Sequence, residues 1–539
     1  MRMKRWSLLT ALLVAFVASS SVTLVLAQEA TPVAPSLASP VAEASPVAEG
    51  TPVTQETATH HGINVADMDL SADPREDFFR FANGGWLDRT EIPGDRASMD
   101  AFTELRDETT RLLIDLLQQL GQGGDLEEGS DEWKAVQIFN QTLDMTTRNA
   151  QAFDPIKPTL EEIDAIGNLD ELHAFLQDSF FKGVPGLFPV YVYSGLEDSS
   201  VYEANLFGPN VWLPSKDYYV DTDEATKDIQ AKYVETLAEL LGYAGYDAAQ
   251  AKASGQAVFD FEQTMMEQVL SREESQDIAN FNHPMTLEEL EQLYPLMDWQ
   301  AYATALGIPN VSHLLVTELR YMQALDGIVR ATSLETIKDD LKLQLLWNHR
   351  LWLGEDIQTT SFDFRARELS GLTDQPPAEE RALDMVNGVL GEAVGQIYVQ
   401  EAFPPEAKAQ IEALVDSILE SFRERLEGNA WLSDATKQTA LEKLSKIGVK
   451  VGYPDKWRSY DAVEIESSFD ATMQSATNAE ARRQLARVDQ PVDRTEWNAL
   501  PQEVNAFYDP SNNDITFPAG ILQPPFFDYQ ADPASNFGG

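Results

Sequence analysis

The apolar residues of this chain recur mainly with the period of an α-helix. The clearest case is a stripe of positions spaced by one, three or four residues: Ile411, Leu414, Val415, Ile418, Leu419, Phe422 and Leu426. Pro404 and Pro405 precede the stripe and Gly428 follows it, and these residue types begin and end helices. The spacing predicts one long amphipathic helix, and the same period dominates from Met68 to about Leu500.

A few segments show the pattern of β-strands instead. Residues 190–193 read Val-Tyr-Val-Tyr, and residues 504–508 and 514–517 flank the sequence Asp-Pro-Ser-Asn-Asn, which predicts a strand, a turn and a strand. The sequence Thr286-Leu287-Glu288-Glu289 is that of a capping box, which marks the start of a helix. The predicted fold class is therefore mainly α, with a large multi-helix lobe and a few β-strands.

The first 27 residues have the pattern of a secretory signal. Arg2, Lys4 and Arg5 form a basic start, residues 6–27 are apolar or small, and Ala27 ends the stretch, as signal peptidase requires. The apolar stretch also approaches the roughly 20 residues that span a bilayer. Residues 1–27 are predicted to be a signal peptide, and an uncleaved membrane tether through residues 6–27 is the alternative.

Residues 28–61 repeat Thr-Pro-Val or Ser-Pro-Val among alanine and glutamate, and end in His60-His61. This composition has little to bury and favours extended conformations, so it predicts a disordered linker. Two adjacent histidines can capture a metal adventitiously, but a plain linker is the simpler interpretation. Together, the two N-terminal segments predict an extracytoplasmic protein, either secreted or tethered to the cell envelope.

Composition excludes several functions. The chain has 39 basic and 88 acidic residues, a formal net charge of -49, so it should repel nucleic acids. It has no cysteine, which excludes disulfides and thiolate ligands, and points to an exported bacterial protein. Any metal would need histidine or carboxylate ligands.

The usual catalytic motifs are also missing. The sequence contains six histidines but no His-Glu-x-x-His, and it has no Gly-x-Ser-x-Gly and no glycine-rich phosphate loop. The residues taken alone therefore indicate an exported, acidic, mostly helical protein without a self-evident reaction centre.

Short motifs along nearly the whole chain are similar to those of one known family. The first is Asp73-Pro74-Arg75-Glu76-Asp77-Phe78-Phe79, followed by Asn83-Gly84-Gly85-Trp86. Further motifs are Leu213-Pro214 with Tyr218-Tyr219, Met285-Thr286-Leu287, Trp431 with Thr436, Ala440 and Lys443, and Gly452-Tyr453-Pro454. The most specific are Val504-Asn505-Ala506-Phe507-Tyr508, Phe517-Pro518-Ala519-Gly520, Pro525-Phe526-Phe527 and Asn536-Phe537-Gly538-Gly539. In these motifs the chain resembles the neprilysin-like zinc metallopeptidases, the M13 family.

The resemblance implies a domain organisation and a substrate site. Residues 62–500 correspond to the family's N-terminal helical domain, and residues 501–539 to the opening strands of its thermolysin-like catalytic lobe. By the same resemblance, Asn505 and Ala506 bind the main chain of a short, extended peptide substrate. The alternative role of Asn505 is to stabilise the start of the hairpin turn.

The resemblance also implies zinc chemistry that these residues do not contain. In complete members a helix with His-Glu-x-x-His follows, whereas this sequence reaches Gly539 before that helix. We therefore expect the chain to hold no catalytic residue, no metal ligand and no zinc, and to be inactive alone, with the catalytic lobe as a missing partner if it is encoded separately. A catalytically dead exported peptide-binding protein and an unrelated helical binding module are the alternatives.

The C-terminal motifs are rich in apolar side chains that a further lobe would cover. Without that lobe, we expect these side chains to be exposed and to form an aggregation-prone surface. They are Phe507, Ile515, Phe517, Ile521, Leu522, Phe526 and Phe527.

Overall fold

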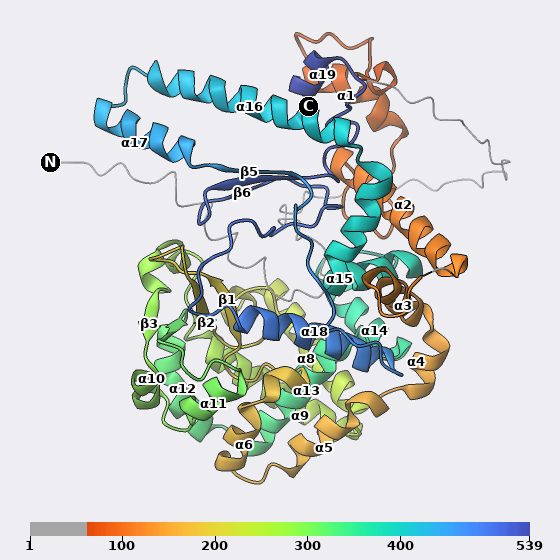
Figure 1. Cartoon of the computed structure of the whole chain (residues 1–539). Helices are drawn as coiled ribbons and strands as arrows, with labels where there is room; N and C mark the ends of the chain where they lie inside the picture. The colour runs from red at the N-terminus through yellow and green to blue at the C-terminus, as the bar shows by residue number, and fades with distance from the viewer. Residues whose placement is uncertain (1–61, 125, 539) are drawn as a thin grey trace.

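The computed structural model describes residues 62–124 and 126–538, and shows two lobes, one above the other in Figure 1. The signal sequence expected at residues 1–27 and the linker expected at residues 28–61 lie outside the described residues. Within the described part of the chain, no helix combines the length and the apolar character that a bilayer crossing requires. The prediction of a mainly helical fold with few strands is confirmed.

The first lobe, the lower one in Figure 1, is built on a core that lies mostly within residues 156–364. Its helices are α4 (Met145–Gln151), α5 (Lys157–Ala165), α6 (Leu169–Leu176), α7 (Asp217–Val220), α8 (Glu224–Tyr243), α9 (Ala248–Met266), α10 (Leu287–Leu293), α11 (Trp299–Ala305), α12 (Leu319–Ala331), α13 (Leu334–His349) and α14 (Glu355–Phe362). A four-stranded sheet has the order β1-β2-β4-β3. Its strands are β1 (Val190–Ser194), β2 (Tyr202–Leu206), β3 (His283–Met285) and β4 (Leu314–Val316).

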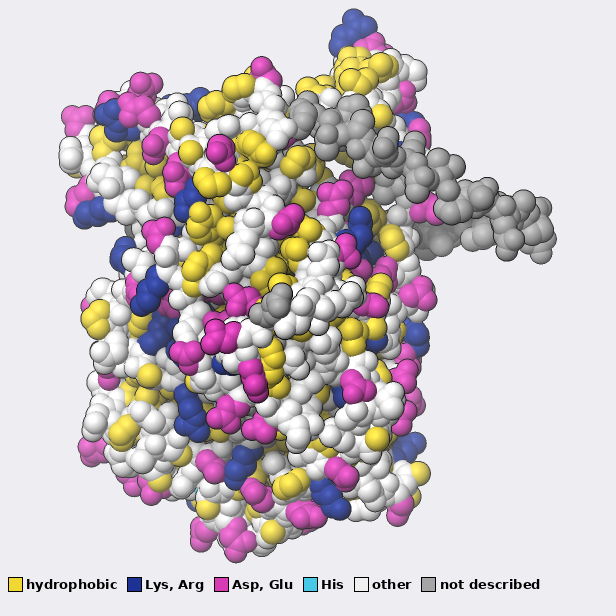
Figure 2. Space-filling view, turned by 45° about the vertical axis from the view of Figure 1, so that its right-hand side comes forward, with side chains coloured by type: hydrophobic (Ala, Val, Ile, Leu, Met, Phe, Trp, Pro, Cys, Tyr) yellow, Lys and Arg dark blue, Asp and Glu magenta, His cyan; other side chains and the backbone are white. Residues whose placement is uncertain are grey.

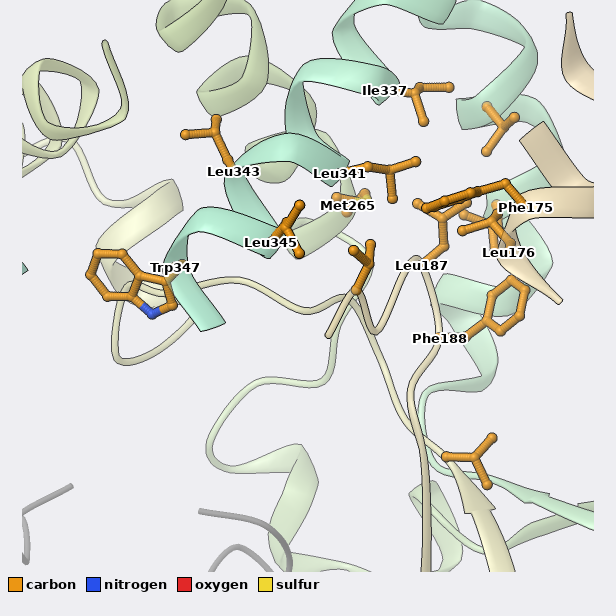
Figure 3. Packing of buried hydrophobic residues seen from close by; sticks show 14 of the residues in the cluster. Phe175, Leu176, Leu187, Phe188, Met265, Ile337, Leu341, Leu343, Leu345 and Trp347 are labelled. Atoms are coloured by element: carbon orange, nitrogen blue, oxygen red, sulfur yellow. The ribbon is translucent and has the colours of Figure 1, made fainter. Parts of the chain in front are cut away.

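Helix α13 runs through the middle of this core (Figure 3). Every side chain from Ile337 to Trp347 is buried, as expected of a helix surrounded by protein on all sides. The polar residues in this stretch must therefore find partners inside the lobe. The amide of Gln344 does so by donating to Asp340 at 2.9 Å and to the carbonyl of Gly186 at 3.2 Å.

The second lobe has its own core. Its helices are α1 (Phe78–Arg89), α2 (Ala101–Gly123), α3 (Asp131–Leu143), α15 (Ala378–Ala402), α16 (Pro405–Glu427), α17 (Asp434–Ser445) and α19 (Pro533–Gly538). Helix α18 (Phe469–Leu485) joins the lobes, because Phe469 and Met473 belong to the second core and Leu485 to the first.

A three-stranded sheet in the second lobe has the order β5-β7-β6. Strand β5 (Gly448–Gly452) is parallel to β7 (Asp514–Pro518), and β6 (Phe507–Asp509) is antiparallel to β7. Gly452 ends β5 with a φ of 78°, a left-handed conformation that glycine adopts without strain. The pairing of β5 with β7 joins two segments that are more than 60 residues apart in sequence, and it leaves β6 at the edge of the sheet.

Several local predictions are confirmed. The apolar stripe forms α16, which begins at Pro405 and ends at Glu427. Thr286 and Glu289 form the capping box of α10, and residues 190–193 lie in β1.

The strand expected at residues 504–508 begins later than predicted, at Phe507. The Val504 side chain is buried in the second core with 4% exposure, and the Asn505 side chain accepts a hydrogen bond from the Ala506 amide at 2.9 Å. Residues 504–506 therefore lie outside the β-ladder.

The expectation of an exposed apolar surface over residues 504–539 is wrong for the side chains it named. Ile521, Leu522 and Phe527 are buried, Ile515, Phe517 and Phe526 are partly buried against the second core, and Phe507 is partly buried. The reason is that α15, α16 and β5 already pack around this segment.

Exposed apolar side chains occur instead on α1 and along the outer half of α16. They include Phe78, Phe79, Ile418, Phe422 and, after α16, Trp431 with 82% exposure. Figure 2 shows hydrophobic side chains gathered over the upper lobe, among scattered charged ones.

The first prediction concerns the ion pair that joins β5 to β7. Lys450 and Asp514 lie 2.7 Å apart with side-chain exposures of 10% and 6%. Replacing Lys450 with methionine leaves the Asp514 carboxylate buried without its cation, so Lys450→Met should lower the free energy of unfolding by about 3 to 5 kcal/mol. Chemical denaturation measures this loss.

The matched control is Lys446→Met. Lys446 pairs with Glu442 at the same distance of 2.7 Å, but both side chains are more than half exposed, so the loss should be about 0 to 1 kcal/mol. Equal losses in the two variants would contradict the role given to the buried pair.

The second prediction concerns Asp340, which is fully buried in α13. Burial raises its pKa to about 7, and the nearby charge of Asp339 adds to the rise. The unfolded chain has a pKa near 4 for this group, so the wild-type protein loses stability as pH rises from about 4 to about 7.

Asp340→Asn removes this titration while leaving an acceptor for Gln344. Its stability relative to wild type should rise across that pH interval by a few kcal/mol, since one pKa unit is worth about 1.4 kcal/mol. Urea unfolding at several pH values tests this, with the exposed Glu291→Gln on α10 as control. A stability difference that does not change with pH would refute the assignment.

Candidate functional site

The edge of the three-stranded sheet is the first element of the candidate site. In the described part of the chain, β6 pairs with β7 on one side, and no strand lies on its other side. Asn505 and Ala506 directly precede this strand, with Asn505 partly exposed and Ala506 exposed. An open strand edge of this kind presents backbone groups to which an extended peptide can pair.

Asn505 was predicted either to bind peptide or to stabilise the start of the hairpin turn, and the hairpin contacts bear on the second role. The turn after β6 is held by Asp509, which accepts hydrogen bonds from the amides of Ser511 at 2.8 Å and Asn512 at 3.3 Å, and from the Asn512 side chain at 2.8 Å. The Asn505 side chain accepts a hydrogen bond from the adjacent Ala506 amide. In these contacts Asp509 holds the turn, and both roles of Asn505 stay predictions.

A cavity of about 440 Å³ between the lobes is the second element. It is lined by α15, α18, β1 and residues 496–503. Asn505 and Ala506 do not line it, but Glu503 does, two residues earlier. Burial raises the pKa of Glu503, and a hydrogen bond from the Leu500 amide only partly opposes that rise.

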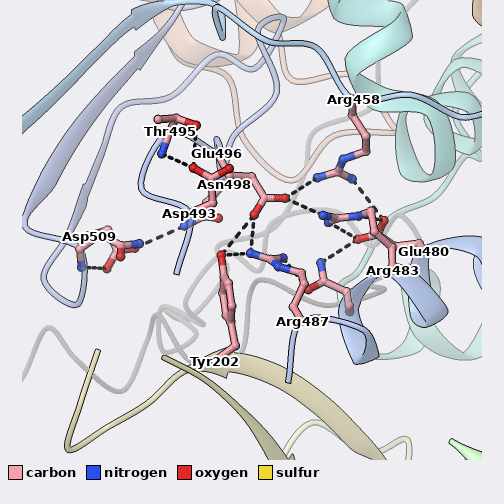
Figure 4. A network of polar contacts seen from close by, with 12 residues as sticks. Tyr202, Arg458, Glu480, Arg483, Arg487, Asp493, Thr495, Glu496, Asn498 and Asp509 are labelled. Carbon is pink, nitrogen blue, oxygen red and sulfur yellow. Dashed lines mark hydrogen bonds and ion pairs between the residues drawn. The ribbon is translucent and has the colours of Figure 1, made fainter. Parts of the chain in front are cut away.

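Six charged residues beside this cavity form a cluster that we call the arginine–glutamate cluster, and Figure 4 labels all of them except Glu392. Its members are Glu392, Arg458, Glu480, Arg483, Arg487 and Glu496. Arg483 donates to Glu480 with two hydrogen bonds of 2.8 Å and to Glu496 at 2.6 Å. Burial would raise the pKa of Glu480, but the hydrogen bond from Arg483 and the charge of Arg458 outweigh it and lower that pKa.

Sequence analysis missed this cluster. Glu480 and Arg483 lie three residues apart on α18, and Arg487 follows four residues later in the turn after the helix ends at Leu485; spacings of three and four are those of neighbours on one helix face. That spacing was a usable signal. The partners Arg458 and Glu496 come from separate connecting segments, and no local pattern indicates them.

A second group has the residue types of a nucleophilic site but not its geometry. Ser312 Oγ lies 2.9 Å from His313 Nδ1, and Glu203 lies 3.4 Å from His313 Nε2. The Ser312 hydroxyl donates to Asp489 at 3.1 Å, and the Ser312 amide also bonds Asp489. None of these residues lines the cavity, so the group joins two loops and does not position a nucleophile for a substrate.

The described residues do not fit a zinc ion. Among residues 62–124 and 126–538, no group of three or more histidine, aspartate or glutamate side chains is arranged to hold a metal. His173 is buried between the Leu169 carbonyl and the Tyr294 hydroxyl, both at 2.6 Å, and His349 is buried against Asp470 at 2.6 Å. His60 and His61 lie outside the described residues.

The family relationship follows from comparison with known sequences. Sequence models described as peptidase family M13 match residues 74–454 and residues 505–539. The neutral endopeptidase of Lactobacillus helveticus is 29% identical over 481 residues, which cover 88% of this chain and 74% of that protein. The endothelin-converting enzyme-like 1 of Homo sapiens is 29% identical over 513 residues, covering 88% of this chain and 64% of that protein.

Solved structures agree with the sequences. The zinc metalloprotease ZMP1 of Mycobacterium tuberculosis, in complex with an inhibitor, superposes with a TM-score of 0.81 at 32% identity, over 89% of this chain and 73% of that one. PepO from Lactobacillus rhamnosis gives a TM-score of 0.76 at 25% identity, over 87% of this chain and 74% of that one. The chain belongs to peptidase family M13.

Proposed function

We propose that this chain is the peptide-capturing portion of an exported neprilysin-like zinc metalloendopeptidase, which hydrolyses bonds in short peptides. The match to peptidase family M13 over residues 74–454 and 505–539 carries this proposal. Residues 62–500 would form the helical domain and residues 501–539 the start of the catalytic domain. The structural similarity to a zinc metalloprotease over 89% of this chain supports the assignment to this class of peptidase.

The proposed substrate site is the open edge beside β6. A peptide that pairs there would use the backbone of Ala506 and the amide of Asn505, while alternate side chains point into pockets. The Ala506 amide is now bonded to its neighbour Asn505 at 2.9 Å. Peptide binding would exchange this local bond for one to substrate, which gives Asn505 a direct part in capture.

We propose that these residues do not hydrolyse peptides by themselves. Complete zinc peptidases hold the metal with three protein ligands and use it to activate water, and the described residues supply no such set. A catalytic lobe, if encoded separately, is then the required partner. The exposed apolar side chains of α1 and α16 offer a surface for it.

The alternative is a catalytically dead exported protein that binds peptides. The nucleotide sequence after the codon for Gly539 separates the two. A reading frame that encodes His-Glu-x-x-His supports the peptidase, and a stop codon there supports the binding protein.

The location and remaining partners follow from the N-terminal segments and the charge. We propose that residues 1–27 direct export, either as a cleaved signal or as a tether through residues 6–27. A net charge of -49 disfavours nucleic acid as a partner.

The third prediction tests peptide capture directly. Asn505→Ala should weaken binding of a fluorescein-labelled heptapeptide with a central Phe-Leu by about tenfold, because one or two hydrogen bonds are worth about 1.4 kcal/mol. Fluorescence anisotropy measures the dissociation constant.

The matched control is Asn310→Ala, since Asn310 is exposed and lies in the first lobe. It should bind the peptide as the wild-type chain does. If the two variants bind equally well, Asn505 does not contact the peptide.

A further inference from the structure

The segment that leads from α18 to β6 is hydrogen-bonded to the first lobe and, within a few residues, to the second lobe. Up to Val492 it pairs with the first lobe, where the Tyr202 amide bonds the Gln490 carbonyl at 3.0 Å and the Val492 amide bonds the Ser200 carbonyl at 2.8 Å. The next attachment is to the second lobe, where Arg494 donates to the Asn512 carbonyl at 2.9 Å and the Glu496 carbonyl accepts from Lys450. Only Asp493 lies between Val492 and the first residue bonded to the second lobe.

The side chain of Glu496 reaches back to the first lobe (Figure 4). Its carboxylate accepts from Arg483 at 2.6 Å and from Arg487, both near the end of α18 whose Leu485 lies in the first core. The Tyr202 hydroxyl of β2 lies 3.3 Å away. One carboxylate therefore receives two guanidinium groups and a phenol from this lobe.

The backbone of Glu496 is held by the second lobe. Its carbonyl accepts from Lys450 Nζ at 2.8 Å, and the same ammonium group pairs with Asp514 at 2.7 Å. Lys450 lies in β5 and Asp514 in β7. Glu496 is thus bonded to the three-stranded sheet through its backbone and to α18 through its side chain.

We propose that Glu496 is the coupling residue of a hinge between the two lobes. Its ion pairs with Arg483 and Arg487 set the position of the sheet, and with it the Asn505–Ala506 segment, relative to β1 and β2. When these ion pairs are released, the three-stranded sheet, α16 and α17 can move away from the first lobe. This inference goes beyond the proposed function and holds whether or not Asn505 binds peptide.

The charge balance of the cluster explains why one carboxylate matters. Three arginines face three glutamates, and the guanidinium group of Arg458 is 3.4 Å from Glu480 and 3.7 Å from both Glu392 and Glu496. Without the Glu496 charge, two carboxylates remain for three mutually repelling guanidinium groups. The side chains of Glu496 and its three arginines are 19 to 30% exposed, so dissolved salt can reach them.

The test measures the distance between the lobes. Because the chain has no cysteine, Gln292→Cys on α10 and Gln438→Cys on α17 provide two specific, exposed sites for spin labels. Pulsed electron resonance then gives the distance distribution. Glu496→Gln should shift this distribution to longer distances and broaden it, while the far-ultraviolet circular dichroism of the protein stays unchanged.

The matched control is Glu420→Gln. Glu420 also pairs with an arginine, Arg423, but both residues lie on the exposed face of α16, so the distances should stay as in the wild type. A folded Glu496→Gln protein with wild-type distances would overturn the proposal.

A salt series on the doubly labelled protein with Glu496 intact decides the question even if the variant fails to fold. Raising the ionic strength from about 0.1 M to about 1 M shortens the screening length from about 10 Å to about 3 Å. The distribution should then move to longer distances, and one that salt does not change would also overturn the proposal.

Discussion

The buried ion pair between Lys450 and Asp514 is the contact on which the second lobe depends. It joins β5 to β7 across more than 60 residues of sequence, and the same ammonium group holds the Glu496 carbonyl. Strand β6 is placed at the sheet edge only because β7 is already paired with β5. One buried cation therefore supports both the sheet that Asn505 and Ala506 lead into and the backbone of Glu496, whose side chain bonds the first lobe.

The two lobes differ in how completely their surfaces are covered. Among the exposed large hydrophobic side chains of the described residues, all except Ile278 lie within residues 62–102 or 418–537. The first lobe thus exposes few large apolar side chains, as is typical of a soluble globular domain, whereas the second lobe exposes several on α1 and α16. This asymmetry supports our proposal that a further part of an M13 peptidase packs on the second lobe.

Periodicity and local motifs predicted those helices and strands that a short stretch of sequence defines by itself. The stripe from Ile411 to Leu426 is enough to define α16, and the capping box at Thr286 marks α10. The same stripe did not indicate that Ile418 and Phe422 are left uncovered, since exposure depends on what packs against a helix. The arginine–glutamate cluster was missed because Arg458 and Glu496 reach α18 from separate segments. Asn505 and Ala506 were identified only through the family resemblance, and periodicity alone would have missed both.

We propose that this member of peptidase family M13 holds no zinc by itself, since among the described residues no group of three or more histidine, aspartate or glutamate side chains is arranged to hold a metal. The most direct test is the zinc content of the purified 539-residue chain after dialysis, together with cleavage of a quenched fluorescent peptide with and without a chelator. We expect substoichiometric zinc and no chelator-sensitive cleavage. Stoichiometric zinc with chelator-sensitive turnover would show that the chain has a zinc site of its own.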